Sequence, residues 1–210
     1  MRHHAAYGLG FESLDVMIVE DSKVMQSILR SMFNSLKVAR LRVFGDGTEA
    51  LAAMLSEPPN LIVTDWNMKP MSGYRLLKTI RSAGMGPLCR VPAIVVTAHA
   101  TRAMVDKAMR VGSHHVVVKP FSPAALVARL ESILADQRPM ILDEVRQTWR
   151  IEGVDELIAA NSAKLRALDT ARQFHEGIAN RARTVQASVD KILADATIPV
   201  EAPAPVRVEA

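Results

Sequence analysis

The strongest constraint on the fold is a regular alternation of two kinds of segment between residue 15 and about residue 136. Short runs rich in β-branched residues alternate with longer segments whose apolar residues recur every three or four positions. Consecutive units of this kind predict strands joined by right-handed helical crossovers, which make the strands parallel. The sequence therefore predicts an α/β fold with a doubly wound five-stranded parallel sheet and helices on both faces. The expected strands are 15–20, 40–44, 61–65, 92–97 and 115–119.

The helical segments begin with residues that commonly cap helices. Ser22, Ser72 and either Asp46 or Thr48 precede the apolar positions of three of these segments. The side chains of Ser, Thr and Asp accept hydrogen bonds from the backbone N–H groups that a helix leaves free at its start. We therefore expect these residues to be helix N-caps.

Composition limits the class of protein. The chain of 210 residues is 49% apolar, which is ample for a buried core. No stretch approaches the roughly 18 uninterrupted apolar residues of a membrane-spanning helix. The single cysteine cannot form an internal disulfide, and the N-terminus has no apolar run of signal-peptide length. We therefore expect a cytoplasmic protein that does not associate with membranes.

After Arg138 the pattern of strands gives way to a helical pattern. Apolar residues recur every three or four positions from Leu165 to Ile192, which predicts one helix of about 35 residues. Upstream, residues 139–160 are expected to form a shorter helix or an ordered linker, with a break at Gly153. Residues 139–210 carry 9 Lys and Arg against 11 Asp and Glu, so this part is not a basic nucleic-acid-binding arm.

Four regions are expected along the chain. They are an N-terminal extension (1–13), the α/β domain (14–137), a helical extension (138–196) and a flexible proline-rich end (197–210). A long apolar stripe beside a globular domain leaves a large apolar surface in need of a partner. We expect the helical extension to be a dimerisation or partner-docking arm, with self-association favoured; folding back onto the domain is the other possibility.

Polar and charged side chains end four of the five expected strands. Glu20 and Asp21 end the first, Asp65 the third, Thr97 the fourth and Lys119 the fifth. The carboxyl ends of the strands in a doubly wound sheet are where ligands bind. Three clustered carboxylates repel one another, and hard oxygen ligands that leave room for water suit Mg²⁺. An ammonium and a hydroxyl beside them suit a phosphoryl group.

No phosphate-cradling glycine loop follows the first strand, where the sequence reads VEDSKVM. A nucleotide is therefore not the expected ligand at the strand ends. The remaining interpretation is that Asp65 itself receives a phosphoryl group while a metal ion and Lys119 neutralise the charge of the transition state.

The order and spacing of several motifs resemble the receiver domain of two-component response regulators over about residues 14–136. The motifs are MIVEDS, GDGTEAL, LIVTDWNMKPMSGY, VVTA and VVVKPF. The resemblance implies a flavodoxin-like sheet with strand order 2-1-3-4-5. It also implies Mg²⁺, held by the acidic pair, the phosphoacceptor and a loop carbonyl, which map onto Glu20, Asp21, Asp65 and Asn67.

The same resemblance implies a signalling function. Asp65 would be the phosphoacceptor, Thr97 the switch hydroxyl and Lys119 the phosphoryl partner, with a sensor histidine kinase or a phosphotransfer protein as donor. Such a protein is not an enzyme in the ordinary sense, although it assists its own phosphorylation and dephosphorylation. Phosphorylation would change dimerisation or protein binding, most often through the fourth helix, fifth strand and fifth helix of this family; no DNA partner is expected.

Two departures from the family pattern stand out. Family members usually have an aromatic residue three positions before the lysine, where this chain has Val116, so the usual aromatic readout is in question. The neighbouring His115 is expected on the opposite face of its strand. In the loop after Asp65, the proline of Lys69-Pro70 is displaced by one position. By resemblance, the Lys119-Pro120 peptide is expected to be cis.

Other functions are considered beside this one. Residues 139–210 could be the output module of a transcriptional regulator or a phosphotransfer module of a phosphorelay, since His175-Glu176 resembles a phosphoaccepting helix. A phosphatase or phosphotransferase of the haloacid-dehalogenase kind is disfavoured, because its nucleophile follows the first strand and Asp65 follows the third.

Overall fold

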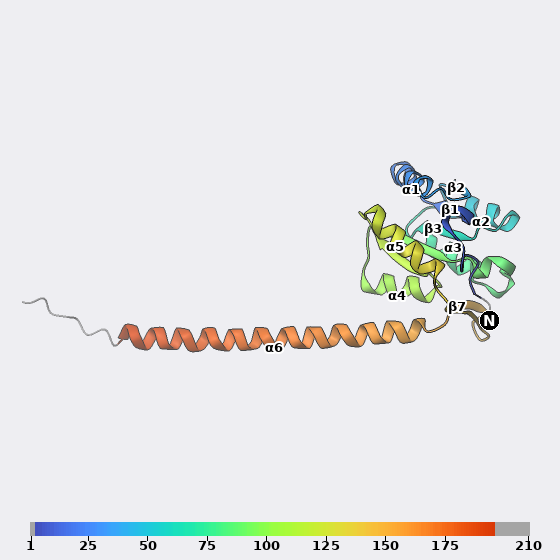
Figure 1. Ribbon diagram of the computed structural model, residues 1–210. Helices are drawn as coiled ribbons and strands as arrows, with labels where there is room; N and C mark the ends of the chain where they lie inside the picture. Colours follow the sequence, from blue (N-terminus) through green and yellow to red (C-terminus); the bar gives the residue numbers. More distant parts are fainter. Residues whose placement is uncertain (1–2, 196–210) are drawn as a thin grey trace, which may run out of the picture. The chain divides into compact units, whose positions relative to one another are not determined.

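The α/β domain is built on one parallel sheet in the order β2-β1-β3-β4-β5 (Figure 1). The structure, a computed structural model, describes residues 3–195. All four neighbouring pairs of strands run parallel. The predicted fold class and strand order are confirmed. The strands are β1 (Asp15–Val19), β2 (Arg40–Phe44), β3 (Leu61–Asp65), β4 (Ala93–Thr97) and β5 (His115–Val118).

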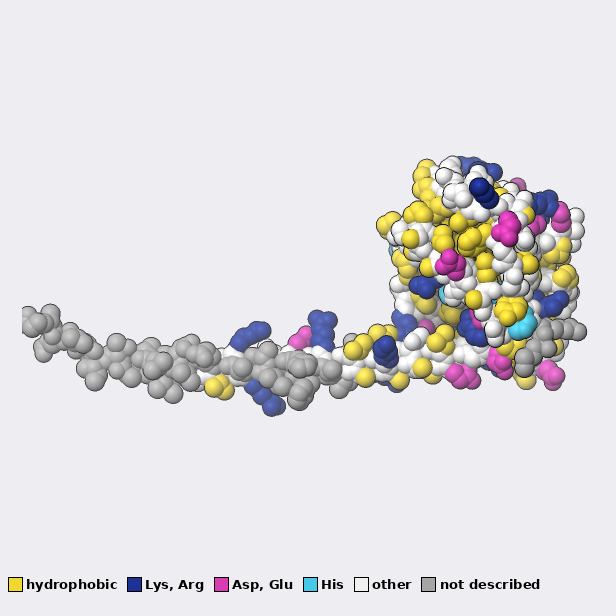
Figure 2. Space-filling view, in the orientation of Figure 1, with side chains coloured by type: hydrophobic (Ala, Val, Ile, Leu, Met, Phe, Trp, Pro, Cys, Tyr) yellow, Lys and Arg dark blue, Asp and Glu magenta, His cyan; other side chains and the backbone are white. Residues whose placement is uncertain are grey.

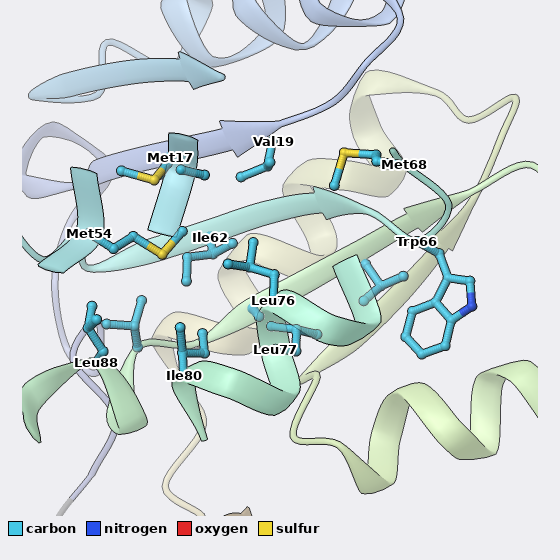
Figure 3. Packing of buried hydrophobic residues seen from close by; sticks show 14 of the residues in the cluster. Met17, Val19, Met54, Ile62, Trp66, Met68, Leu76, Leu77, Ile80 and Leu88 are labelled. Atoms are coloured by element: carbon cyan, nitrogen blue, oxygen red, sulfur yellow. The ribbon is translucent and has the colours of Figure 1, made fainter. Parts of the chain in front are cut away.

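Helices cover both faces of this sheet. One core lies under α1 (Lys23–Ser35) and α5 (Pro123–Leu134). The other lies under α2 (Gly47–Ser56), α3 (Gly73–Ile80) and α4 (Arg102–Arg110), and Figure 3 shows side chains of α3 meeting those of the sheet. Side chains of β1 alternate between the two cores, as the period of a strand requires. The sheet is therefore buried on both sides, which is why its strands are apolar almost throughout.

The expected caps begin three of these helices. The Ser22 hydroxyl accepts from Met25 N, and the Ser72 hydroxyl accepts from Arg75 N. The Asp46 carboxylate accepts from two backbone N–H groups of the first turn of α2, so Asp46 and not Thr48 is the cap there. These side chains fix where the helices that flank the strand ends begin.

The N-terminal segment is packed against the α/β domain. Ala5 N donates to Arg90 O at 3.0 Å, and Gly8 N donates to Leu134 O at 2.9 Å. Ala6 is fully buried in the core beneath α1 and α5, and the short helix η1 (Phe11–Ser13) follows. The residues expected to form a separate extension, as far as they are described, are thus part of the same compact unit.

The expectation of a helix or linker after residue 138 is wrong for the first part of that region. Residues 140–151 form an antiparallel hairpin of β6 (Met140–Asp143) and β7 (Thr148–Ile151). The Asp143 carboxylate accepts from Val145 N and Arg146 N, so a side chain closes a turn that contains no glycine. Two strands of four residues give too short an alternation to stand out beside the helical pattern downstream.

A long helix, α6 (Val154–Asp195), follows the hairpin, as the apolar stripe predicts. It begins just after Gly153, whose φ of 77° gives the expected break. The chain divides into two compact units, Met1–Ile158 and Ala159–Ala210, so the first turn of α6 belongs with the α/β domain. The side chains of Leu165, Leu168 and Val185 are exposed, and Figure 2 shows basic side chains of α6 pointing to opposite sides of the helix.

None of the helices in the described part of the chain is both long and apolar enough to cross a membrane. The proline-rich end expected over residues 197–210 lies outside the described residues.

Candidate functional site

The predicted site residues lie where four strands of the sheet end. Glu20 follows β1, Asp65 is the last residue of β3, Thr97 the last of β4, and Lys119 follows β5. Three of them are in contact, because Lys119, just after the edge strand β5, reaches both Glu20 and Asp65. Its Nζ donates to Glu20 Oε2 at 2.7 Å and to Asp65 Oδ1 at 2.9 Å. The topology thus joins residues that are 54 and 99 positions from Lys119 in the sequence.

The three charged side chains of this cluster are largely buried, and burial shifts the pKa values of Glu20 and Lys119. The Glu20 side chain is 2% exposed, that of Asp65 10% and that of Lys119 16%. Burial raises the pKa of Glu20, and the hydrogen bond from Lys119 only partly offsets this. Burial lowers the pKa of Lys119, but its bonds to the two carboxylates outweigh burial and keep the pKa above its usual value. Lys119 therefore remains a cation at neutral pH.

Both the carboxylate and the backbone carbonyl of Asp65 are held by neighbouring groups. Asn67 N donates to Asp65 Oδ2 at 2.8 Å, so the second carboxylate oxygen also has a partner. The Thr64 hydroxyl donates to Asp65 O at 3.0 Å. A Cβ added at Gly73 would stand 2.0 Å from the same carbonyl oxygen, so the start of α3 can approach β3 this closely only with glycine. The carboxylate is therefore fixed in place, and its two oxygens have different partners: Oδ1 accepts from Lys119 and Oδ2 from Asn67 N.

Glu20 is positioned by a residue that the sequence reasoning missed. Gln26, on the first turns of α1, is buried and donates from Nε2 to Glu20 O at 2.6 Å. Ser22 N donates to Glu20 Oε1 at 3.3 Å. The only signal in the sequence is a glutamine that falls on the buried side of an amphipathic helix, which gives no indication of its partner.

Thr97 is buried and lies beside the cluster, and in the described part of the chain its hydroxyl makes no hydrogen bond to the carboxylates of Glu20 and Asp65. Its hydroxyl accepts from His99 N at 3.2 Å, and its carbonyl accepts from Lys119 N at 2.8 Å. The side chain of His99 is exposed. The loop after β4 thus touches the cluster through Thr97.

The residues expected to hold a metal fit one by their chemistry. Asp21 and Asn67 are exposed beside the buried pair Glu20 and Asp65. Within residues 3–195, no three His, Cys, Asp or Glu side chains are close enough to hold one ion as they stand. Three carboxyl groups stand against the one ammonium of Lys119, and all the donors are oxygen atoms. Such a set suits a hard divalent cation.

The side chains of β5 point to the faces of the sheet expected for them. Val116 packs against the core under α2, α3 and α4, and Val117 against the core under α1 and α5. By alternation His115 shares the face of Val117, opposite to Val116. The Lys119-Pro120 peptide is cis as expected, and the Lys69-Pro70 peptide is cis as well.

Comparison with known proteins identifies relatives of the α/β domain. A family model described as response regulator receiver domain matches residues 16–131. Chemotaxis protein CheY of Pseudomonas aeruginosa is 33% identical over 120 residues, which are 57% of this chain and 95% of that protein. Chemotaxis protein CheY-3 of Vibrio cholerae is 32% identical over 122 residues, 58% of this chain and 92% of that protein.

One solved structure adds information on the side chains at the strand ends. The receiver domain of sensor histidine kinase PA1611 from Pseudomonas aeruginosa superposes with a TM-score of 0.54 at 26% identity. The match covers 59% of this chain and 99% of that one, and that structure has a magnesium ion coordinated in its active site cleft. The hairpin and α6 lie outside residues 16–131, the part matched by the family model.

Proposed function

Since the chain belongs to the response regulator receiver domain family, we propose that Asp65 accepts a phosphoryl group from a histidine kinase or a phosphotransfer protein. The observation that carries this proposal is the bridge from Lys119 Nζ to Glu20 and Asp65 at the ends of three strands. It supplies a fixed carboxylate nucleophile with a permanent cation beside it. Phosphoryl transfer asks a protein mainly for this kind of positioning and charge neutralisation.

The phosphoryl transfer is a displacement at phosphorus. A carboxylate oxygen of Asp65 forms a bond to phosphorus while the bond from phosphorus to the donor's histidine nitrogen breaks, and the departing imidazole takes up a proton. Attack of water on phosphorus later breaks the new bond, restores the carboxylate and releases inorganic phosphate. Lys119 pairs with the charge on the phosphoryl oxygens, and the Thr97 hydroxyl donates to them.

We assign the metal to Glu20, Asp21, Asp65 and Asn67, as the oxygen donors of the cleft suggest. Bound Mg²⁺ would neutralise charge on the phosphoryl oxygens and on the acidic cluster. Gln26 supports this set from behind, because its bond to Glu20 O fixes the backbone that carries the acidic pair. The magnesium ion named for the PA1611 receiver domain supports the same choice of metal.

The experiment is phosphorylation of the full chain by acetyl phosphate with Mg²⁺, with the added groups counted by intact mass. We expect one phosphoryl group per chain in the wild type and none in Asp65→Asn. The matched control is Asp106→Asn, which removes a partly exposed partner of Arg102 on α4 and should label like the wild type. Uptake by Asp65→Asn equal to that of the control would refute the assignment.

We propose further that the output of the protein runs through α6. The part of α6 that lies in the second compact unit would form a homodimer. A helix of 42 residues with exposed Leu165, Leu168 and Val185 offers an apolar surface that self-association would bury. α4, β5 and α5 would transmit the phosphorylation state to it. The half-buried Val116 supports a readout that does not depend on an inward-turning aromatic ring.

A further inference from the structure

A second cavity lies in the first compact unit, away from the phosphoacceptor cluster. It is lined by residues of α3, α4 and the β6-β7 hairpin and those next to them, is partly open to solvent, and has a volume of about 510 Å³. Ligand pockets of small molecules lie in this range of size. The lining residues are Tyr74, Lys78, Arg81, Ala103, Lys107, Arg110, Val111, Arg146, Thr148 and Trp149.

The charge of this cavity is entirely positive. Five of its lining residues are Lys or Arg, and none is Asp or Glu. Arg110 and Arg146 pair with Asp155 and Asp143, which lie outside the lining. Lys78 and Lys107 make no ion pair with any described carboxylate. Two exposed ammonium groups thus stand at the cavity without a counterion.

The innermost cation is Arg81, which is 1% exposed. Its guanidinium donates five hydrogen bonds, all to carbonyl oxygens of Leu88, Cys89, Val91 and Gly112. Every N–H is satisfied, yet no described carboxylate neutralises the charge. A buried cation with no counterion is costly, and an anion nearby would recover part of that cost. Arg81 therefore adds a fixed positive field to the cavity without needing to touch a ligand.

Two aromatic rings give the cavity its apolar surface. Lys107 Nζ lies 4.0 Å from the centroid of the Tyr74 ring, so this ammonium is held over the ring by a cation–π contact. Trp149 is half-buried and packs against the small core of the hairpin and the start of α6. Flat aromatic surface beside unpaired cations is the combination that recognises a base joined to phosphates.

The hairpin wall is fixed to the α/β domain by main-chain bonds. Trp149 N donates to Arg81 O at 2.7 Å, and Ala83 N donates to Gln147 O at 2.9 Å. Because the hairpin lies outside residues 16–131, three lining residues come from a part of the chain that the family model does not match. The cavity is therefore a feature of this chain and not of the family's phosphoacceptor cleft.

We propose that this cavity binds a nucleotide, with the base against Trp149 and the phosphates beside Lys78 and Lys107. A volume of about 510 Å³ fits a single small molecule of nucleotide size. Arg146 adds a further cation to the lining and is paired with Asp143. Thr148 adds a hydroxyl to the lining.

The test is isothermal titration calorimetry of the full chain with ATP as the probe. EDTA in the buffer prevents metal-dependent binding at the Asp65 cleft from contributing. We expect one site per chain, and we expect Lys78→Gln combined with Lys107→Gln to weaken it at least about tenfold, since each removes a charge-assisted contact. The matched control is Arg30→Gln, which removes an exposed cation from α1 on the opposite face of the sheet.

Adenosine and tripolyphosphate separate the two halves of the proposed ligand. Each should bind at least about tenfold more weakly than ATP if base and phosphates are both recognised. Tripolyphosphate binding as tightly as ATP would overturn the proposal, because the site would then be a simple polyanion patch. So would an absence of heat with ATP, or equal weakening by Arg30→Gln and by the double variant. Tryptophan emission of Trp66→Phe, which leaves Trp149 alone, should change with ATP and not with tripolyphosphate.

Discussion

Lys119 is the residue on which the phosphoacceptor cluster depends. It is the one cation that touches the buried carboxylates of Glu20 and Asp65 among the described residues. Surface ion pairs contribute little, but removing one partner of a buried pair leaves uncompensated charge. The same ammonium therefore stabilises the folded domain and prepares the site for a phosphoryl group.

Replacing this lysine should affect both roles. We expect Lys119→Ala to destabilise the domain by about 3 kcal/mol at pH 7, since two buried carboxylates lose their cation. Phosphoryl uptake from acetyl phosphate should fall sharply. Urea unfolding in EDTA gives the stability, and intact mass gives the uptake. Lys164→Ala, an exposed position in α6, is the control; equal stability of the two variants would contradict the account.

The sequence identified these site residues because they are marked by local position. Asp65, Thr97 and Lys119 each stand at the end of an apolar run, and parallel strands bring such ends together. Gln26 and Arg81 do not stand at the end of an apolar strand. Gln26 donates to a carbonyl 6 residues away and Arg81 to one 31 residues away, and side chains that bind carbonyls leave no pattern of residue types in the chain.

The same distinction holds for the elements. The five strand-helix units and their caps depend on periods and residues within one segment, so they were predictable. The β6-β7 hairpin owes its stability to distant partners: its edge pairs with residues 81–83, and Met140 and Ile151 pack on Met109 of α4. Four-residue strands without such support are marginal, which is why the local pattern did not indicate them.

Three histidines lie where the N-terminal segment meets the start of β5, and burial shifts their pKa values. His4 and His114 are buried with their rings 5.1 Å apart and nearly perpendicular, and His115, the next residue after His114, is half-buried. Burial lowers the pKa of His4 and holds that of His114 well below its usual range. Burial, with Arg129 and Arg138 adding to it, lowers the pKa of His115 to about 4.

These shifts fix the direction of the pH dependence. The unfolded histidines take up protons near pH 6.5, whereas the folded ones resist until about pH 4 in the case of His115. The unfolded state thus binds more protons in this window, and stability falls as pH drops through it. We expect the urea midpoint to be lower at pH 5 than at pH 7, and the difference to shrink in His115→Gln. His99→Gln, an exposed control, should leave it unchanged; a His115→Gln slope equal to the wild type would count against this cause.

On the scale of the whole molecule, the chain combines a receiver domain with a long helix. The hairpin and the first turn of α6 belong to the first compact unit, so a truncation that tests the helix must keep residues 1–158. We expect such a chain to take up a phosphoryl group as the full chain does and to be monomeric by light scattering. The full chain should have twice the mass of one protomer. If both have the same oligomeric state, α6 does not assemble the protein.

The position of the phosphoryl group in the chain is the sharpest test of the assignment to Asp65. The full chain would be treated with acetyl phosphate and Mg²⁺, reduced with borohydride to trap the acyl phosphate, digested and mapped by mass spectrometry. We expect the modification at Asp65, and no modification when EDTA replaces Mg²⁺. Modification at another residue, such as His175 in α6, or uptake that does not require the metal, would contradict it.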